Sequence, residues 1–191
     1  MSSKKKKMLI VSIVAILLCA LSTSAFLTSG EVTDNVITFG NLRLKLINNT
    51  IDNNGDEVSV KQLEEKLTAN NVSRIIKVQN VCKNPMYVRV RVEFEGEDKY
   101  GKFSTKDYVS FNRLDNSWIS KDGWFYYNKV LKPKEKTSDL FRELRFDLDK
   151  LMTDHRGGTL QLNVKAQAVQ SENNGSSAQN ANGWPQEAGK W

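Results

Sequence analysis

The stretch that most constrains the fold is residues 88–95, where the polarity of the side chains alternates at every position. Its members are, in order, Val88, Arg89, Val90, Arg91, Val92, Glu93, Phe94 and Glu95. A period of two places the apolar side chains on one face of a β-strand and the charged side chains on the other. The stretch therefore predicts a strand with one face in a core and one in water. We interpret the charged row as a solvated face; a specific anion site at Arg89 and Arg91 is the alternative.

Three further segments have the composition of strands. Residues 159–170 alternate between apolar and polar side chains, and residues 72–82 form an apolar-rich run. Residues 117–127 place Asp122-Gly123 between two aromatic runs, which is a strong signal for a β-hairpin. Together these segments predict an all-β protein, an antiparallel β-sandwich over residues 41–170.

Three segments allow more than one structure. Residues 36–47 change the parity of their apolar positions at Gly40, which indicates either a bulge or break between two short strands, or a turn at Gly40-Asn41. Residues 140–148 alternate imperfectly and fit a strand or a short helix. Residues 60–67 carry two leucines four apart and favour one or two helical turns. We therefore expect one or two short helices beside the sheets.

The N-terminus has the three parts of a secretory signal peptide. Lys4 to Lys7 supply the positive charges, residues 8–21 are apolar, and small residues stand at Thr23 and Ala25. We predict that residues 1–25 are the signal peptide and that cleavage occurs between Ala25 and Phe26. The alternative is a retained anchor, because residues 8–27 just reach the roughly 20 residues of a spanning helix.

Removal of this peptide changes the charge of the chain. The whole chain has 28 Lys and Arg against 22 Asp and Glu, and the first 25 residues contain four Lys and no acid. The exported chain then has 24 against 22, a net charge of +2, which gives no support to a nucleic-acid partner. It retains one cysteine, Cys82, so no internal disulfide can form and a buried thiol is expected.

The sequence contains no constellation suited to catalysis. His155 is the single histidine, and neither HExxH nor GxSxG occurs. We therefore expect no enzyme activity, no metal site and no cofactor. Residues 171–183 are rich in Asn, Ser and Gly, so residues 171–191 are expected to form a flexible tail, although Trp184 and Trp191 could dock on the domain or on a neighbour.

Several of these pieces, in this order, resemble one family of exported bacterial proteins. The pieces are a Lys-rich signal ending at Ser24-Ala25, Phe26 at the new N-terminus, residues 37–44 (ITFGNLRL), residues 87–92 (YVRVRV), residues 122–127 (DGWFYY), residues 164–170 (VKAQAVQ) and the late Trp184-Pro185. The chain resembles the SipW-dependent exported proteins, the TasA/camelysin group, and is most similar to the BsaA-type biofilm matrix proteins and pilins. The resemblance implies a jelly-roll β-sandwich, cleavage by a signal peptidase of SipW type, secretion to the extracellular matrix or cell surface, and self-assembly into fibres. Contact with the membrane is then expected only through the signal peptide before cleavage.

Physical chemistry suggests how such fibres could form. Residues 26–40 are a candidate donor strand, because residues 26–39 are compatible with β-structure and have no partner nearby in the sequence. Added to the sheet edge of the next subunit, this segment would make a head-to-tail contact that does not close. Phe26, Ile37 and Phe39 are its candidate anchors. The same segment could instead pair within its own subunit.

Two other classes of function compete with a fibre subunit. Camelysin relatives are described as metalloproteases, so one rival is a cell-surface protease that uses His155 with nearby carboxylates. The other is a monomeric carbohydrate-binding module, whose aromatic platform would come from Trp118, Trp124, Tyr126 and Tyr127.

Overall fold

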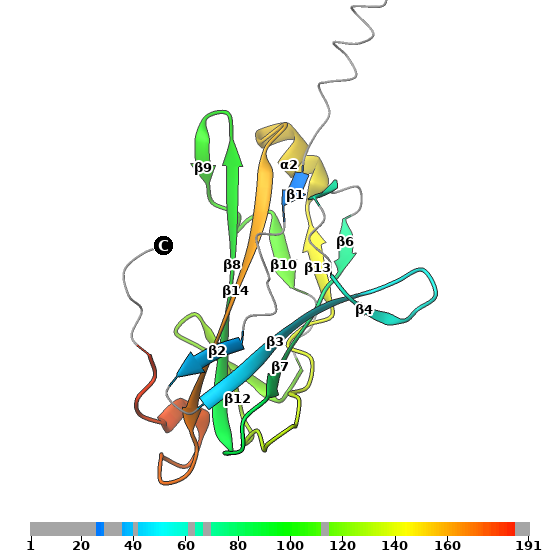
Figure 1. Ribbon diagram of the computed structural model, residues 1–191. Helices are drawn as coiled ribbons and strands as arrows, with labels where there is room; N and C mark the ends of the chain where they lie inside the picture. Colours follow the sequence, from blue (N-terminus) through cyan, green and yellow to red (C-terminus); the bar gives the residue numbers. More distant parts are fainter. Residues whose placement is uncertain are drawn as a thin grey trace, which may run out of the picture.

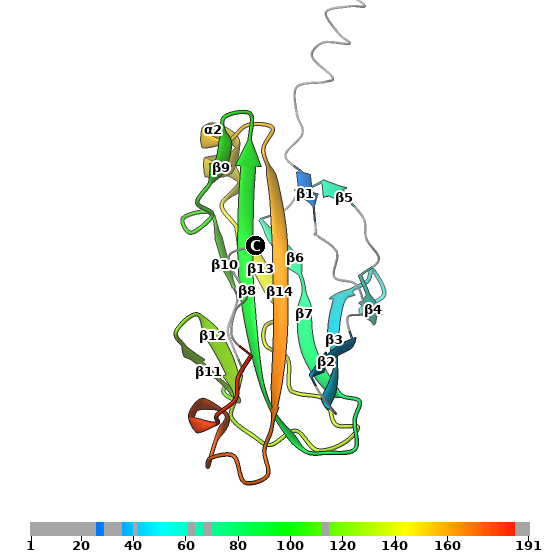
Figure 2. The ribbon, with the colours of Figure 1, turned by 60° about the vertical axis from the view of Figure 1, so that its left-hand side comes forward.

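The computed structural model describes residues 26–28, 36–39, 42–60, 64–66, 70–111 and 115–185. The predicted signal peptide lies outside them. The described chain is all-β, and its strands are mostly antiparallel (Figures 1 and 2). No helix within these residues is long and apolar enough to cross a membrane.

The largest sheet is built around the two longest strands. β8 (Met86–Asp98) and β14 (Thr159–Gln170) pair antiparallel over the whole length of β14. The sheet order is β11-β12-β8-β14-β1-β5, with β9 paired to the end of β8. Its shorter members are β11 (Trp118–Lys121), β12 (Trp124–Tyr127), β1 (Phe26–Thr28), β5 (Glu64–Lys66) and β9 (Gly101–Phe103). The β8–β14 pair forms the long axis of the molecule in Figure 2.

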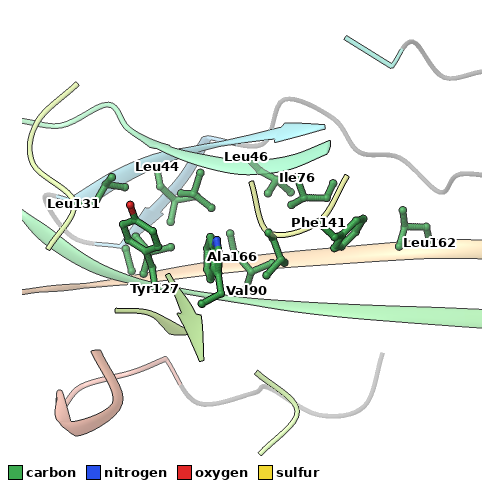
Figure 3. Close-up of a cluster of buried hydrophobic side chains, with 14 of the residues drawn as sticks. Leu44, Leu46, Ile76, Val90, Tyr127, Leu131, Phe141, Leu162 and Ala166 are labelled. Atoms are coloured by element: carbon green, nitrogen blue, oxygen red, sulfur yellow. The ribbon is translucent and has the colours of Figure 1, made fainter. Parts of the chain in front are cut away.

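Two smaller sheets complete the described fold. Figure 3 shows the cyan and teal strands of one of them across the core from β8 and β14. One has the order β2-β3-β4, with β7 also paired to β3, and the other has the order β10-β13-β6. Their strands are β2 (Val36–Phe39), β3 (Leu42–Ile51), β4 (Glu57–Ser59), β7 (Ile75–Asn80), β10 (Val109–Phe111), β13 (Glu143–Phe146) and β6 (Asn71–Ser73). Only Arg74 separates β6 from β7, so the two small sheets continue into one another.

The core confirms the alternation read from residues 88–95. Val88 and Val90 are completely buried, and Val92 and Phe94 pack against the same cluster. Figure 3 shows apolar side chains from both layers meeting between them. They include Leu44, Leu46, Ile76, Val90, Phe141, Leu162 and Ala166, each 2% exposed or less. Burying a side chain of the larger kind contributes roughly 1.5–3 kcal/mol, so this interface between layers is the main source of stability.

The aromatic hairpin also forms as predicted. β11 and β12 pair with Lys121 opposite Trp124, which leaves Asp122 and Gly123 as a two-residue turn. Both have positive φ, 52° and 76°, as the turn type favoured in tight hairpins requires. Cys82 is a buried free thiol, as expected.

The expected helical turns at residues 60–67 are wrong. Glu64–Lys66 form strand β5, which pairs antiparallel with β1, so sheet pairing prevails over the local leucine spacing. The α-helix lies further along the chain: β13 covers Glu143–Phe146 and is followed by α2 (Leu148–Asp154). The Asp147 carboxylate accepts a hydrogen bond from the Lys150 N–H (3.0 Å) and so caps the start of this helix.

The expectation of a flexible C-terminal tail is wrong for residues 171–185. Residues 171–185, which we call the C-terminal strap, fold back over the outer face of the large sheet and include the short 3-10 helix η1 (Ala178–Asn180). A hydrogen bond within the strap links its two ends: Asn174 Oδ1 accepts from the Asn182 N–H at 2.7 Å. Trp191 lies outside the described residues.

Candidate functional site: the outer edge of β14

β14 has one edge on β8 and one edge facing away from it. The Ser171 N–H donates to Pro85 O (3.4 Å), which places residues 171 and 85 in a hydrogen-bonded pair. Because such pairs alternate along an antiparallel ladder, every second residue of β14 turns its N–H and C=O to the outer edge. These residues are Leu160, Leu162, Val164, Ala166, Ala168 and Gln170.

Only the first part of this edge is paired by a described strand. β1 lies parallel to it, with Phe26 opposite Thr159, Leu27 opposite Leu160 and Thr28 opposite Gln161. Within the described strands, no partner continues this ladder from Leu162 to Gln170. As far as the described residues extend, the outer edge of β14 is therefore a sheet edge that is open to a further strand over most of its length.

The candidate donor segment pairs within its own chain in this monomer. β1 lies between β14 and β5, and β2 pairs antiparallel with β3, with Ile37 opposite Leu44 and Phe39 opposite Leu42. Gly40 and Asn41, where the sequence left a turn or a bulge or break open, lie outside the described residues. The expectation that the segment is donated to a neighbour is untested by a single chain.

A groove lies beside the far end of the open edge. It has a volume of about 420 Å³ and is lined by Leu42, by Ala168, Val169 and Gln170 of β14, and by Asn174, Asn182, Gly183 and Pro185 of the strap. The groove places the start of β3, where the candidate donor segment is attached, beside the C-terminal end of β14. The tip of that segment at Phe26 lies beside the N-terminal end of β14.

The face of the large sheet that was expected to be solvated is partly covered. The Arg89 guanidinium lies between two indole rings, 4.1 Å from the centroid of Trp124 and 4.6 Å from that of Trp184. Its Nε and Nη2 donate to Gln167 Oε1 at 2.9 and 2.7 Å, and its Nη1 donates to the Tyr126 hydroxyl at 3.1 Å. Arg89 thus holds the strap on the sheet by cation–π contacts and hydrogen bonds, and its donors are directed into the protein. The solvated interpretation is wrong for Arg89 and holds for Glu93 further along β8, which is exposed.

The aromatic residues of the hairpin do not form an open platform. Trp118 and Tyr127 belong to the main core. Trp124 and Tyr126 form a second apolar cluster with Trp184 and two alanines of the strap. Each of the four is 7% exposed or less, so the carbohydrate-binding alternative would require the strap to leave.

His155 lies at the end of the molecule that carries β9 and α2. Its Nδ1 is 2.8 Å from Asp98 Oδ2, and its Nε2 is 3.2 Å from the Tyr108 hydroxyl, which in turn donates to Asp154 Oδ2 at 3.0 Å. Phe103 stacks on the imidazole with 3.6 Å between ring centroids. Both ring nitrogens face protein groups, so His155 joins β8, β9 and α2 rather than pointing into an open site.

A catalytic zinc site needs three protein ligands and an open position. Within the described residues, no group of three or more potential ligands comes together. A hollow with a volume of about 390 Å³ is lined by Tyr108, whereas His155 and Asp98 do not line it.

The Asp98–His155 pair makes stability depend on pH. The hydrogen bond from His155, reinforced by that from the Tyr100 N–H, lowers the pKa of the Asp98 carboxyl below its ordinary 3.8. A lowered pKa in the folded state means that its stabilising contribution is present above the ordinary pKa and is lost as the pH falls through the folded value. We expect Asp98→Asn to weaken the acid-induced loss of stability below about pH 4, measured by urea unfolding between pH 2 and pH 6. Asp107→Asn, a change at an exposed neighbouring aspartate, should leave the acid limb unchanged; equal flattening by both would contradict this assignment.

Sequence reasoning did not find the Arg89 cluster or the outer edge of β14. Both depend on residues far apart in the chain, and the one available signal was the pair of late tryptophans in a polar tail. Among the predicted site residues, Phe26, Ile37 and Phe39 all lie on strands of the described chain, and Ala25 lies outside it.

Fold and site together define a class of protein: an all-β domain with one incompletely paired sheet edge and an N-terminal segment beside it. Comparison with known proteins adds no name to this class, because no family model, no curated protein and no solved structure matches the chain.

Proposed function

We propose that this protein is a secreted structural protein of the bacterial extracellular matrix, a fibre subunit that polymerises by donating its N-terminal strand to a neighbour. The observation that carries this proposal is the outer edge of β14. No described strand continues the ladder on this edge beyond Gln161, and β1 pairs there with three residues. Open edges with unpaired N–H and C=O groups add strands from other chains.

The position of the donor segment supports its transfer from its own domain to a neighbouring subunit. The segment is attached at Leu42, beside the C-terminal end of β14, and its tip lies near the opposite end of the same strand. Swung outward about residues 40–41, it would extend past its own domain by up to roughly 45 Å, at about 3.3 Å per residue. That length is sufficient to run along the whole of a neighbour's β14.

The proposal includes the finer features that the family resemblance implies: a jelly-roll arrangement of the sandwich, cleavage after Ala25 by a signal peptidase of SipW type, and no enzymatic activity. The engagement of both His155 nitrogens and the covered aromatic face argue against the protease and the carbohydrate-binding module.

The experiment is to shear surface material from producing cells and examine it by electron microscopy and N-terminal sequencing. We expect filaments whose subunit begins at Phe26, because cleavage there frees the donor strand. Recovery of an intact N-terminus in the membrane fraction would establish the retained anchor instead. Dispersed monomers at high concentration would favour a monomeric binding module.

A further inference from the structure

The chain contains three Asn-Gly dipeptides, Asn54-Gly55, Asn174-Gly175 and Asn182-Gly183, and the last two lie in the C-terminal strap. In such a dipeptide the backbone nitrogen of the glycine can attack the asparagine carboxamide, because glycine has no Cβ to hinder the approach. This reaction contributes to the thermal lability of asparagine. It requires a carboxamide that is free to turn and a glycine N–H that is not engaged elsewhere. The fold therefore decides which of the three sites can react.

The Asn54-Gly55 site is closed by its turn. The Gly55 N–H donates to Asp52 O at 3.1 Å, so the attacking nitrogen is engaged. The Asp52 carboxylate also accepts from the Asn54 N–H and from the Asp56 N–H, both at 2.9 Å, which fixes the backbone around the dipeptide. The glycine nitrogen can react only after this turn opens.

The Asn174-Gly175 site is closed by the bonds of its carboxamide. Asn174 Nδ2 donates to Gln170 O (2.8 Å) and to Asn182 O (3.0 Å), and Asn174 Oδ1 accepts from the Asn182 N–H (2.7 Å). The Tyr87 hydroxyl donates to Gly175 O at 3.2 Å and holds the glycine on the sheet. The carboxamide would have to give up all three of its bonds before it could turn toward the glycine nitrogen.

Asn182-Gly183 differs from both. Asn182 is exposed, and within the residues that the structure describes no hydrogen bond holds its carboxamide or the Gly183 N–H. Both residues line the groove of about 420 Å³ beside the end of β14. Apart from its chain neighbours, no described atom lies within 4 Å of the position that a Cβ on Gly183 would occupy. The Asn182 carboxamide therefore has room to turn back onto the main chain, and water has access to it.

We propose that Asn182 is a site of spontaneous deamidation and that the reaction loosens the C-terminal strap. The Gly183 nitrogen, after losing its proton to solvent, forms a bond to Asn182 Cγ; the Cγ–Nδ2 bond breaks, and ammonia leaves. Water then opens the five-membered imide at either carbonyl, which gives an aspartyl or an isoaspartyl residue with a new carboxylate. Solvent is the one co-reactant. The inference does not depend on fibre formation.

The isoaspartyl product changes the strap where the strap is closed. The main chain then runs through the former side-chain carbon and is one atom longer, and the Asn182 carbonyl that accepts from Asn174 becomes a free carboxylate. Two residues further on, Trp184 lies edge-on to Tyr126, with 5.9 Å between ring centroids, and 4.6 Å from the Arg89 guanidinium. We expect the lengthened chain to lose one of these two attachments, which opens the strap.

The test follows the three dipeptides by peptide mapping in purified protein kept at neutral and at mildly alkaline pH. Each deamidation raises the mass of its peptide by about 1 Da and adds one negative charge. We expect position 182 to react at least tenfold faster than positions 54 and 174, a ratio that corresponds to about 1.4 kcal/mol of hydrogen bonding. The rate should rise with pH. In protein unfolded by guanidinium chloride the three sites should react at similar rates, because only the fold distinguishes them.

Hydrogen exchange of residues 171–185 measures the effect on the strap. We expect the isoaspartyl fraction of aged protein to lose protection at least tenfold. Asn182→Gln keeps the backbone bonds to Asn174 and should neither react nor loosen, because its carboxamide would have to form a larger ring. Fresh Asn182→Asp protein carries the new charge without the longer main chain and should keep the strap closed. Equal rates at the three positions of the folded protein, or no reaction at position 182, would overturn the site; full protection in the isoaspartyl fraction would overturn its effect on the strap.

Discussion

A protein that begins at Asn41, and therefore lacks the candidate donor segment, is expected to remain folded but to form no filaments. Every buried side chain that the structure describes in the main core, between the β8–β14 pair and strands β3, β7 and β13, comes from Leu44 or later in the chain. The loss removes β1, which lies between β14 and β5, and β2, which pairs with β3. We therefore expect a lower unfolding temperature together with complete loss of polymerisation. Electron microscopy and thermal unfolding of the truncated and exported forms measure the two effects.

A synthetic peptide covering residues 26–39 provides the complementary result. It should bind the open edge of β14. Binding should raise the unfolding temperature of the truncated domain, and it should stop the exported form from polymerising. Burial of each large anchor contributes roughly 1.5–3 kcal/mol, so a peptide with Ile37→Asp and Phe39→Asp is the control and should do neither. Filaments of the truncated protein at the normal rate would show that another surface joins the subunits.

Replacing the buried Asn80 with alanine is expected to destabilise the domain by about 2–5 kcal/mol. The Asn80 side chain donates to two backbone carbonyls, and its Oδ1 accepts from the Cys82 N–H at 2.9 Å. Alanine would leave the Cys82 N–H without this acceptor and would remove the stronger donor of Asn84 O and one of two donors of Leu131 O, at roughly 1–3 kcal/mol for each buried group affected. Urea unfolding gives the free energy directly.

The control for this substitution is Asn84→Ala, which keeps the backbone carbonyl that Asn80 uses and changes only an exposed side chain. We expect an effect within about 0.5 kcal/mol. A loss equal to that of Asn80→Ala would show that the loops 81–85 and 131–136 are not held together by the buried Asn80 amide.

The parts of the fold that the sequence predicts well are those encoded locally. The alternation in residues 88–95 and 159–170 specifies two strands that then pair along their length, and Asp122-Gly123 specifies the hairpin turn. Residues 60–67 show the limit, because a leucine spacing typical of a helix is overridden by pairing with β1.

The C-terminal strap could not be predicted for a different reason. Its composition is that of a disordered segment, and its order comes from contacts with residues nearly a hundred positions earlier, such as Arg89 with the Pro185 carbonyl. The same holds for His155, whose partners Asp98 and Tyr108 come from separate elements. Local patterns specify strands; the pairing of side chains between distant strands requires the assembled core.

The parallel pairing of β1 with β14 has a consequence for when assembly begins. A tethered strand occupies its own edge at an effective concentration that can reach the millimolar range. Under the proposed function, a newly exported monomer would therefore be protected against premature association. This protection rests on only three residue pairs in the parallel arrangement, which is the slightly weaker of the two. If subunits stack end to end in one orientation, a strand arriving from the next subunit would run antiparallel to β14 and could pair along its whole length. The monomer would then be metastable with respect to the filament. Polymerisation should show a lag phase, and adding preformed filaments as seeds should abolish it.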